Sequence, residues 1–542
     1  MIILERTAHA GPGEPGVPPA ASPSDAAVTH LEFSGTRRPG NRYSIRYRLD
    51  ERCAFVRGRG WWLYAASPTG LAIFTGLREL LSQAPAPALP LATVLEKLED
   101  LRPVAFLAFD ETTETLHFGR SLDGFASLFF GTAESRLVIA DSRTAVAERL
   151  GPVRFSERDR QEWCAHFALH PEGSFYEGVQ RCFAGTRYQI AAHEGAPRIA
   201  CLLAADADAA SYSDPVGLLT DGLRALFASY GNRKVALHLS GGVDSRTLLA
   251  GLMDAVREGI LHRDQVLCTS VLFPGFDCDE SDVIRPVVER SGFEWVGIEA
   301  TRDNVRRAWE ACLTLPAPPF PTSFMTALCR DAARQRGAEI MLTGHGGDEL
   351  FDFNLADVLG LPLAGRLQRL DLIRYLRHPR NGREEAKALA VAVLGRRGQR
   401  QLCRSIKDYH LPASSLAALR ISTRLALATG CGYETAAVAA TGHGLMTDVP
   451  FFRGPFWSRL DPVAEARDRD YRYKYCARRY MQARAPDVAA VPTRKVAFDA
   501  AVAGLLQPPR ANCDAVDSAA ARVYAGGASY TGWREHHKVR DE

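Results

Sequence analysis

Residues 235–246, VALHLSGGVDSR, decide the fold of the second half of this chain. Val235, Leu237 and Leu239 alternate with smaller or polar residues, a pattern that predicts a short buried strand. Residues 247–252, TLLAGL, open a helix, and the tight turn before them contains Ser240, Gly241, Gly242, Asp244 and Ser245. Glycines let backbone amides converge and a helix N-terminus carries positive potential, so this turn suits a phosphate group. The chain has no GxxxxGK(S/T) pattern, which excludes a Walker loop.

The composition is that of an ordinary globular protein. With 542 residues, 46% of them hydrophobic and 24% charged, the chain is long enough for two domains. A formal net charge of +3 does not favour a dedicated nucleic-acid binder. We find no apolar run of about 18 residues and no secretion signal. Twelve cysteines without a CxxC pair indicate reduced thiols rather than a zinc site or disulfides, so we expect a cytoplasmic protein.

The sequence divides into four parts. Residues 1–30 are expected to be a disordered tail, because positions 8–28 are rich in Pro, Gly, Ala and Ser. Residues 31–208 contain many short strand-like stretches separated by turns, which predict a compact, largely antiparallel sheet domain. The clearest of these stretches are Tyr43–Leu49, Trp61–Ala66, Val104–Phe109, Thr115–Gly119, Ser127–Thr132 and Arg136–Asp141. Residues 209–508 are expected to form a second domain and 509–542 a C-terminal extension.

In the second domain the predicted elements follow a different order, in which helices and strands alternate. Strands are predicted at 235–239, 266–273, 294–298 and 339–342, and helices at 216–229, 247–258, 279–291 and 323–336. This alternation predicts an α/β fold with a doubly wound parallel sheet, whose ligands bind at the carboxyl ends of the strands. Beyond Leu355 the chain reads as mainly helical.

A second glycine turn lies at residues 342–353, LTGHGGDELFDF, again after a short strand. If the two strands are neighbours, Asp348 and Glu349 would face the first turn. Asp244 and Asp348 would then be a natural pair of oxygen ligands for Mg²⁺ bridging ATP phosphates. The alternative for each acidic residue alone is a helix cap.

These two stretches, with their order and separation, resemble the synthetase domain of the asparagine synthetase family. In that family Ser-Gly-Gly-x-Asp-Ser is the pyrophosphate loop of enzymes that split ATP into AMP and pyrophosphate; the alternative is a glycine-rich turn of an unrelated α/β domain. The resemblance continues in HGLMTDVPFF at 443–452, in VPTRKVAF at 491–498 and, more weakly, in residues 106–140. It implies two parts: an N-terminal glutaminase-like relic of the Ntn-type αββα fold, and a PP-loop ATP pyrophosphatase domain (adenine nucleotide alpha hydrolase-like).

The resemblance also implies roles for single residues. The first turn would hold the pyrophosphate portion of ATP, with Asp244 and Asp348 on magnesium. Arg246 would touch phosphate or a substrate carboxylate. Lys495 matches the lysine that stabilises charge while a carboxylate attacks the α-phosphate, although by its own spacing it could be a surface lysine. The remaining nucleotide-binding residues would be Leu272 and Phe273 beside adenine, with Gly344 and Gly346 in the second turn.

Two departures from the family pattern narrow the range of activities that the resemblance implies. Glutamine-dependent members need a cysteine at position 2, where this sequence has Ile2, and Cys53 lies within the chain. We therefore expect no glutamine hydrolysis. In the second turn asparagine synthetases carry glutamate and β-lactam synthetases carry tyrosine, whereas this chain has His345. Histidine can act as a general base near neutral pH, while the alternative is that it hydrogen-bonds phosphate or shapes the turn.

Among ring-closing members, LTGHGGDELF is most similar to the cyclases of lasso peptide biosynthesis. The resemblance implies a carbon-nitrogen ligase that adenylates a peptide Asp or Glu side chain and closes a macrolactam with the N-terminal amine. It further implies ATP and Mg²⁺, a precursor peptide substrate, and a leader peptidase and a leader-recognition protein as partners. A β-lactam synthetase-like enzyme, an ammonia-dependent asparagine synthetase and a non-catalytic ATP-binding scaffold are the alternatives.

Overall fold

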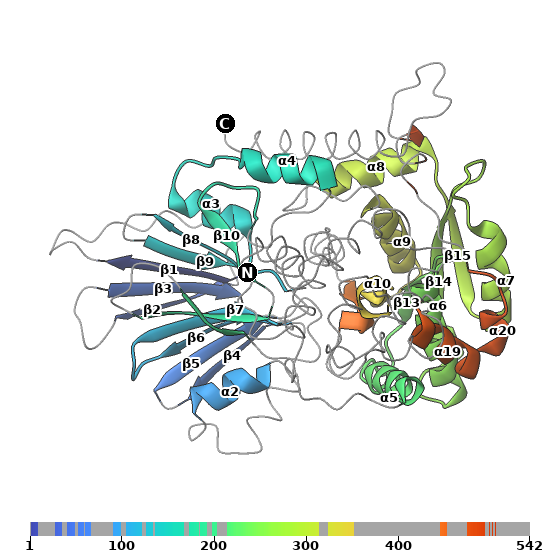
Figure 1. Cartoon of the computed structure of the whole chain (residues 1–542), viewed down its shortest axis with the longest axis horizontal. Helices are drawn as coiled ribbons and strands as arrows, with labels where there is room; N and C mark the ends of the chain where they lie inside the picture. The colour runs from blue at the N-terminus through green and yellow to red at the C-terminus, as the bar shows by residue number, and fades with distance from the viewer. Residues whose placement is uncertain are drawn as a thin grey trace, which may run out of the picture.

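The protein contains three sheets, two antiparallel and one parallel, which Figure 1 shows on its left and right sides. The computed structural model describes these positions: 2–8, 28–34, 41–48, 53–58, 60–66, 90–98, 104–121, 126–133, 136–166, 173–183, 185–191, 198–202, 214–313, 323–351, 445–452, 474–493, 498, 501, 504 and 505. Of the mainly helical part expected beyond Leu355, the described residues include two helices, at 475–484 and 486–489. The extension expected at 509–542 lies outside the described residues. No helix in the described part is long and apolar enough to cross a membrane.

Six strands form each antiparallel sheet. The first has the order β10 (Val179–Arg181), β8 (Phe129–Ala133), β9 (Arg136–Ala140), β1 (Ile2–Ala8), β3 (Asn41–Arg48) and β2 (Val28–Ser34). The second has the order β12 (Arg198–Leu202), β11 (Thr186–Ala191), β7 (Thr115–Arg120), β6 (Ala105–Asp110), β5 (Trp61–Ala66) and β4 (Cys53–Gly58). Every pair in both sheets is antiparallel.

The strands whose side chains are described pack between a shared core and an outer helix layer. Tyr64 and Leu107 of the second sheet pack with Leu137 and Ile139 of the first, which places one core between the sheets. On the far side of the second sheet, α2 (Leu91–Lys97) packs on residues such as Leu63. On the far side of the first sheet lie α3 (Arg143–Leu150) and α4 (Glu157–His166). The described layers are thus helix, sheet, sheet, helix. Strands buried on both faces explain continuous apolar runs such as WWLYAA in β5.

The expectation of a disordered tail over residues 1–30 is wrong for residues 28–30, which begin β2, and for residues 2–8. Residues 2–8 form β1, which pairs with β9 on one side and with β3 on the other. The segment has only three leading apolar residues, Ile2, Ile3 and Leu4, before charged ones, so its sequence gives little signal. Its hydrogen bonds come from strands far along the chain, which local sequence patterns do not reveal.

The third sheet is parallel throughout, as predicted. Its order is β15 (Glu294–Glu299), β14 (Val266–Leu272), β13 (Val235–His238), β16 (Ile340–Leu342) and β17 (Met446–Asp448). The chain moves outward from β13 to β15 and then returns to the other side of β13 for β16. This reversal between β13 and β16 is the point at which open α/β sheets bind ligands.

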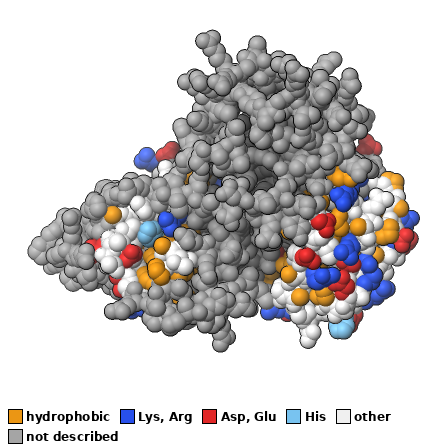
Figure 2. Space-filling view, turned by 60° about the horizontal axis from the view of Figure 1, so that its bottom comes forward, with side chains coloured by type: hydrophobic (Ala, Val, Ile, Leu, Met, Phe, Trp, Pro, Cys, Tyr) orange, Lys and Arg blue, Asp and Glu red, His pale blue; other side chains and the backbone are white. Residues whose placement is uncertain are grey.

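Helices cover both faces of the parallel sheet (Figure 1). Val235 and Leu237 face one core, which they share with α5 (Pro215–Ala228), α6 (Val243–Arg257), α7 (Ser281–Ser291), α19 (Tyr475–Arg484) and α20 (Pro486–Ala489). Ala236 faces the opposite core with α8 (Arg302–Leu313) and α9 (Ser323–Gln335). Figure 2 shows acidic and basic side chains interspersed over the described part of this region on the face drawn.

Candidate active site

The two glycine turns lie side by side at the carboxyl edge of the parallel sheet. β13 pairs with β16 in the register Val235↔Ile340 and Leu237↔Leu342, so the turns that follow start level with each other. A Cβ at Gly344 would lie 2.9 Å from the backbone nitrogen of Ser245, and one at Gly347 would overlap the Asp244 carboxyl group. Only glycine permits so close an approach of the two turns.

The first turn is organised by its own serines. The Ser240 N–H donates to the Ser245 hydroxyl over 3.0 Å, and the two hydroxyls are themselves 3.0 Å apart. The Gly242 N–H donates to the Ser240 hydroxyl over 3.3 Å. Gly242 caps α6, so the turn leads directly into a helix of 15 residues. The turn is therefore preformed at a helix N-terminus, as a phosphate site requires.

Glu280 supports the first turn from the next helix. Its carboxylate accepts the Gly241 N–H over 3.0 Å, and the residue is buried. From the sequence alone, Glu280 was expected only to begin a helix. It does precede α7, but its side chain makes no cap there. This contact joins two loops from neighbouring strands, so spacing along the chain could not have revealed it.

Asp244 and Asp348 converge on one ammonium group. Lys474 donates to Asp244 Oδ2, and its Nζ lies 2.8 Å from Asp348 Oδ1. The Lys474 side chain is 2% exposed, against 20% for Asp244 and 48% for Asp348. The predicted convergence of the two carboxylates is therefore present, while Lys474 itself was not predicted. Its only sequence signal was a place among tyrosines and basic residues at 471–480.

This donor set fits Mg²⁺. Two carboxylates facing one point supply the hard oxygen ligands that the ion prefers, and phosphates usually complete its coordination. Within the described ranges no group of three or more His, Cys, Asp or Glu gathers into a complete metal cage. Asp244 and Asp348 would thus hold the ion together with oxygens of a nucleotide. The side chain of Glu349, also expected at this edge, is outside the described part of the chain.

His345 lies in the second turn beside these carboxylates. Its Nδ1 is 2.8 Å from the Thr343 hydroxyl. Burial lowers the pKa of His345 to about 4, although Asp348 acts in the opposite direction. His238, at the end of β13, also has its pKa lowered to about 4, first by burial and then by His345. Both imidazoles are therefore neutral at neutral pH in this state. His238 was not singled out from the sequence.

Arg246 makes contacts other than the expected one. It is completely buried and donates to the backbone carbonyls of Val488 and Val491, each over 2.7 Å, and of Pro492 over 3.0 Å. Burial lowers the pKa of the guanidinium to about 10, so it stays charged. These contacts favour a structural role, tying α6 to the segment after α20, over the predicted contact with phosphate or a substrate carboxylate.

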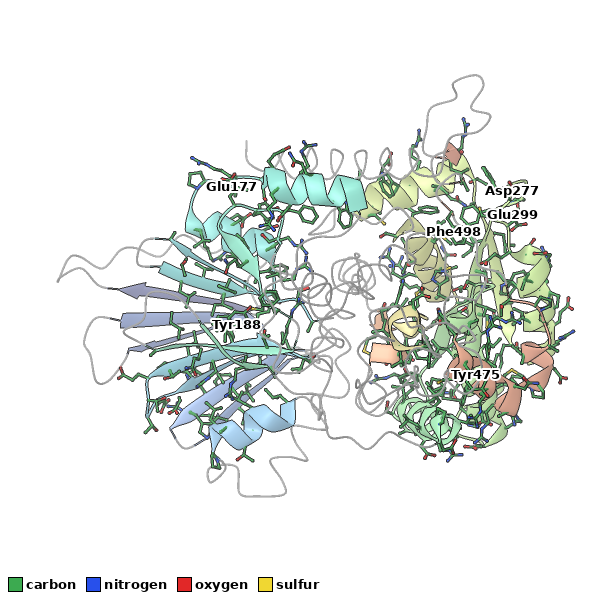
Figure 3. All side chains as sticks on the ribbon, in the orientation of Figure 1. Glu177, Tyr188, Asp277, Glu299, Tyr475 and Phe498 are labelled. Atoms are coloured by element: carbon green, nitrogen blue, oxygen red, sulfur yellow. The ribbon has the colours of Figure 1, made fainter. Side chains whose placement is uncertain are left out.

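Leu272 and Phe273, the residues expected near adenine, lie at the carboxyl end of β14, the strand next to β13. Leu272 ends β14 and is buried, as is Phe273 directly after it. The Phe273 N–H donates to Asp279 Oδ1 over 3.0 Å, and its ring lies 5.3 Å from that of Phe498, labelled in Figure 3. Gly346, in the second turn, has a φ of +86°, which favours glycine.

Lys495, the second predicted catalytic residue, lies at 494–497 outside the described residues. Its neighbours on both sides are described: Pro492 is held by Arg246, and Phe498 packs on Phe273. Pro492 and Phe498 thus each contact an element that reaches the same sheet edge. The role of Lys495 stays a prediction.

Comparison with known proteins identifies the family of this chain. The family model described as "Asparagine synthase" matches residues 228–520, more than half of the chain. A solved glutamine phosphoribosylpyrophosphate (PRPP) amidotransferase from B. subtilis, complexed with ADP and GMP, is 11% identical over 56% of this chain and 67% of that one, with a TM-score of 0.19, too low to support an argument. No curated protein matches. The family match supports ATP-dependent formation of an amide bond. The chain belongs to the asparagine synthase family.

Proposed function

We propose that this protein is an AMP-forming ligase that closes a macrolactam in a peptide, in the manner of the lasso peptide cyclases. It would adenylate an Asp or Glu side chain and join it to the peptide's N-terminal amine. The observation that carries the ATP chemistry is the convergence of Asp244 and Asp348, from two separate turns, beside a preformed phosphate-type loop. A scaffold without turnover has no need of that arrangement.

In the first step the peptide carboxylate attacks the α-phosphorus of ATP. The bond from that phosphorus to the bridging oxygen breaks, and pyrophosphate leaves. The N-terminus of α6, which follows the turn at 240–242, would hold the leaving pyrophosphate. Mg²⁺, when bound by Asp244 and Asp348, would neutralise phosphate charge. Lys474 and Lys495 would stabilise the negative charge that develops around the phosphorus.

In the second step the amine attacks the activated acyl carbon. The carbon–oxygen bond to AMP breaks, an amide forms, and the amine loses a proton. His345 is our candidate for the base that accepts this proton. With a pKa of about 4 it is neutral, which a base must be, but weak. Phosphate charge placed beside the ring would raise the pKa of His345 toward neutrality, where an imidazole is an effective base.

The choice of a peptide substrate rests on the similarity of LTGHGGDELF to lasso peptide cyclases. A leader peptidase and a leader-recognition protein would then be partners, and the reaction would take place in the cytoplasm. The N-terminal sheets would be a relic of a glutaminase domain. One described thiol there, that of Cys182, is completely buried and has a raised pKa, so it is unsuited as a nucleophile.

The test is mass spectrometry of a leader-free candidate peptide incubated with the enzyme, ATP and Mg²⁺. Loss of one water from the peptide, with AMP in solution, would establish the cyclase. AMP without a dehydrated peptide would keep the adenylation and redirect the search to a β-lactam synthetase-like reaction or to asparagine formation from ammonia. Absence of both, with the leader peptidase and recognition protein added, would contradict the proposal. An Asp244→Asn, Asp348→Asn variant serves as the inactive control.

A further inference from the structure

The ammonium of Lys474 occupies the place where Asp244 and Asp348 converge. It donates to Asp244 and lies 2.8 Å from Asp348. A divalent ion bound by the same two oxygens would need the same space. With the ammonium retained, the ion would also meet a like charge at close range. The lysine and a metal ion therefore compete for this position.

Lys474 cannot leave this position without a cost. Its side chain is 2% exposed, and a buried charge without a partner is strongly unfavourable. Its backbone is also fixed, because it precedes α19, whose Cys476, Ala477 and Tyr480 are packed in the core. The backbone has a φ of +48°, an uncommon conformation for a lysine. Only the flexible side chain can move, and it needs a new anionic partner nearby.

We propose that Lys474 keeps divalent metal out of the ligand-free site, and that Mg²⁺ enters only together with the nucleotide. The inference rests on the proposed ATP chemistry. Asp244 directly follows the phosphate-type turn, so the triphosphate would lie within reach of the lysine. Oxygens of the triphosphate then pair with the Lys474 ammonium, and the carboxylates of Asp244 and Asp348 bind the ion. Because binding linkage is reciprocal, metal and nucleotide each strengthen the binding of the other through this side chain.

The experiment measures binding of Mn²⁺, as a probe for Mg²⁺, to the full chain by electron paramagnetic resonance of the free ion. Titrations are made with and without an α,β-methylene analogue of ATP, and the analogue's own affinity for Mn²⁺ is measured without protein and subtracted. We expect the analogue to strengthen Mn²⁺ binding by about 10-fold or more. In Lys474→Met, Mn²⁺ should bind without the analogue about 10-fold more tightly than in the wild type, and the linkage should shrink.

The matched control is Lys234→Met. Lys234 pairs with Glu294 over 3.2 Å at the surface, away from this edge, so its loss should leave Mn²⁺ binding unchanged. Equal Mn²⁺ affinity of the wild type with and without the analogue, or no binding in either, would overturn the inference even if Lys474→Met fails to fold. AMP production is measured separately. If AMP forms but the analogue does not strengthen Mn²⁺ binding, this inference alone is contradicted. If the analogue strengthens Mn²⁺ binding but no AMP forms, this inference holds and the proposed ligase is contradicted.

Discussion

Among single residues, His345 has the surroundings that most alter its chemistry. A partly buried ring with a pKa of about 4 is neutral in the ligand-free site, and its Nδ1 lies 2.8 Å from the Thr343 hydroxyl. In the tautomer in which Nδ1–H donates to that hydroxyl, Nε2 is the atom that accepts the proton of the amine. The histidine thus differs from the glutamate that asparagine synthetases carry here, because it has no charge until a proton arrives.

We predict that His345→Asn slows amide formation by roughly 10²–10⁴-fold, as loss of a general base does, while adenylation stays within a few-fold of wild type. Pyrophosphate–ATP exchange measures the first step, and mass spectrometry of the cyclised peptide measures the second. Thr343→Val, which removes only the hydroxyl beside the ring, should have a smaller effect. Equal loss of both steps in His345→Asn would instead indicate a role on phosphate or in the turn.

Gly347 is a second residue at which a substitution has a specific expected effect. A methyl group there would overlap the Asp244 carboxyl group and push the two turns apart. Gly347→Ala should therefore weaken binding of an ATP analogue at least about 10-fold, since the two carboxylates can no longer converge. Calorimetric titration measures the affinity. Gly504→Ala is the control, because its added methyl group would meet only the Phe276 ring at 3.6 Å. Unchanged affinity in Gly347→Ala would show that the convergence is not needed for nucleotide binding.

Among the elements, α19 and α20 form a unit that is held to α6 at both ends. Lys474 joins its start to Asp244 and Asp348, and Arg246 donates to one carbonyl within α20, that of Val488, and to two just beyond it. Between these points Ala477 and Tyr480 share a core with α6. Residues far apart in the chain thus set the geometry of one sheet edge.

We predict that Arg246→Met destabilises this unit by about 3 kcal/mol, because it removes three charge-assisted hydrogen bonds to backbone carbonyls. Hydrogen exchange should rise first in residues 475–491. Chemical denaturation gives the total loss. Arg263→Met, which removes an exposed arginine that donates to the Gly292 carbonyl over 3.5 Å, should cost far less. Comparable losses in the two variants would refute the idea that Arg246 fastens the unit.

How much the sequence could predict differs between elements for physical reasons. Strand 235–239 and the turn after it were predictable, because alternation, glycines and a helix start lie next to each other in the chain. β5 was predicted with its observed bounds, Trp61–Ala66, because its apolar run is flanked by turn residues. β1 was missed because its stability comes from pairing with β9 and β3. The Lys474 contact was missed for the same reason: it depends on where α19 docks.

The site residues, too, divide into those that the sequence predicts and those that depend on how the elements pack. Asp244 and Asp348 could be paired in advance because parallel neighbouring strands bring their carboxyl ends together. For Arg246, proximity to the turn in sequence suggests phosphate, whereas its side chain is buried and reaches the carbonyls of Val488 and Val491. Glu280 sits beside the turn only because β14 pairs with β13, which no local pattern describes.

Over the whole molecule, partly buried neutral histidines link stability to pH. His117 in the antiparallel part has its pKa lowered to about 4, first by burial and then by Arg187, and His238 and His345 in the parallel part are lowered to about 4 as well. In the unfolded chain histidine has a pKa near 6.5. Between pH 6.5 and 4 the unfolded chain therefore binds more protons, and acid favours unfolding.

We predict that stability is retained above pH 6.5 and falls steadily as the pH drops toward 4, by about 1–2 kcal/mol for each of these histidines, less than the full shift implies because the rings are partly exposed. Urea denaturation from pH 7.5 to 4.5 measures the slope. His238→Phe should reduce the change of the unfolding free energy with pH by the contribution of one histidine. Val305→Ala, which shortens a completely buried side chain in α8, should lower stability at every pH without changing the slope. A slope that His238→Phe leaves intact would mean that this ring does not resist protonation, and the neutral state of its neighbour His345 would lose its support as well.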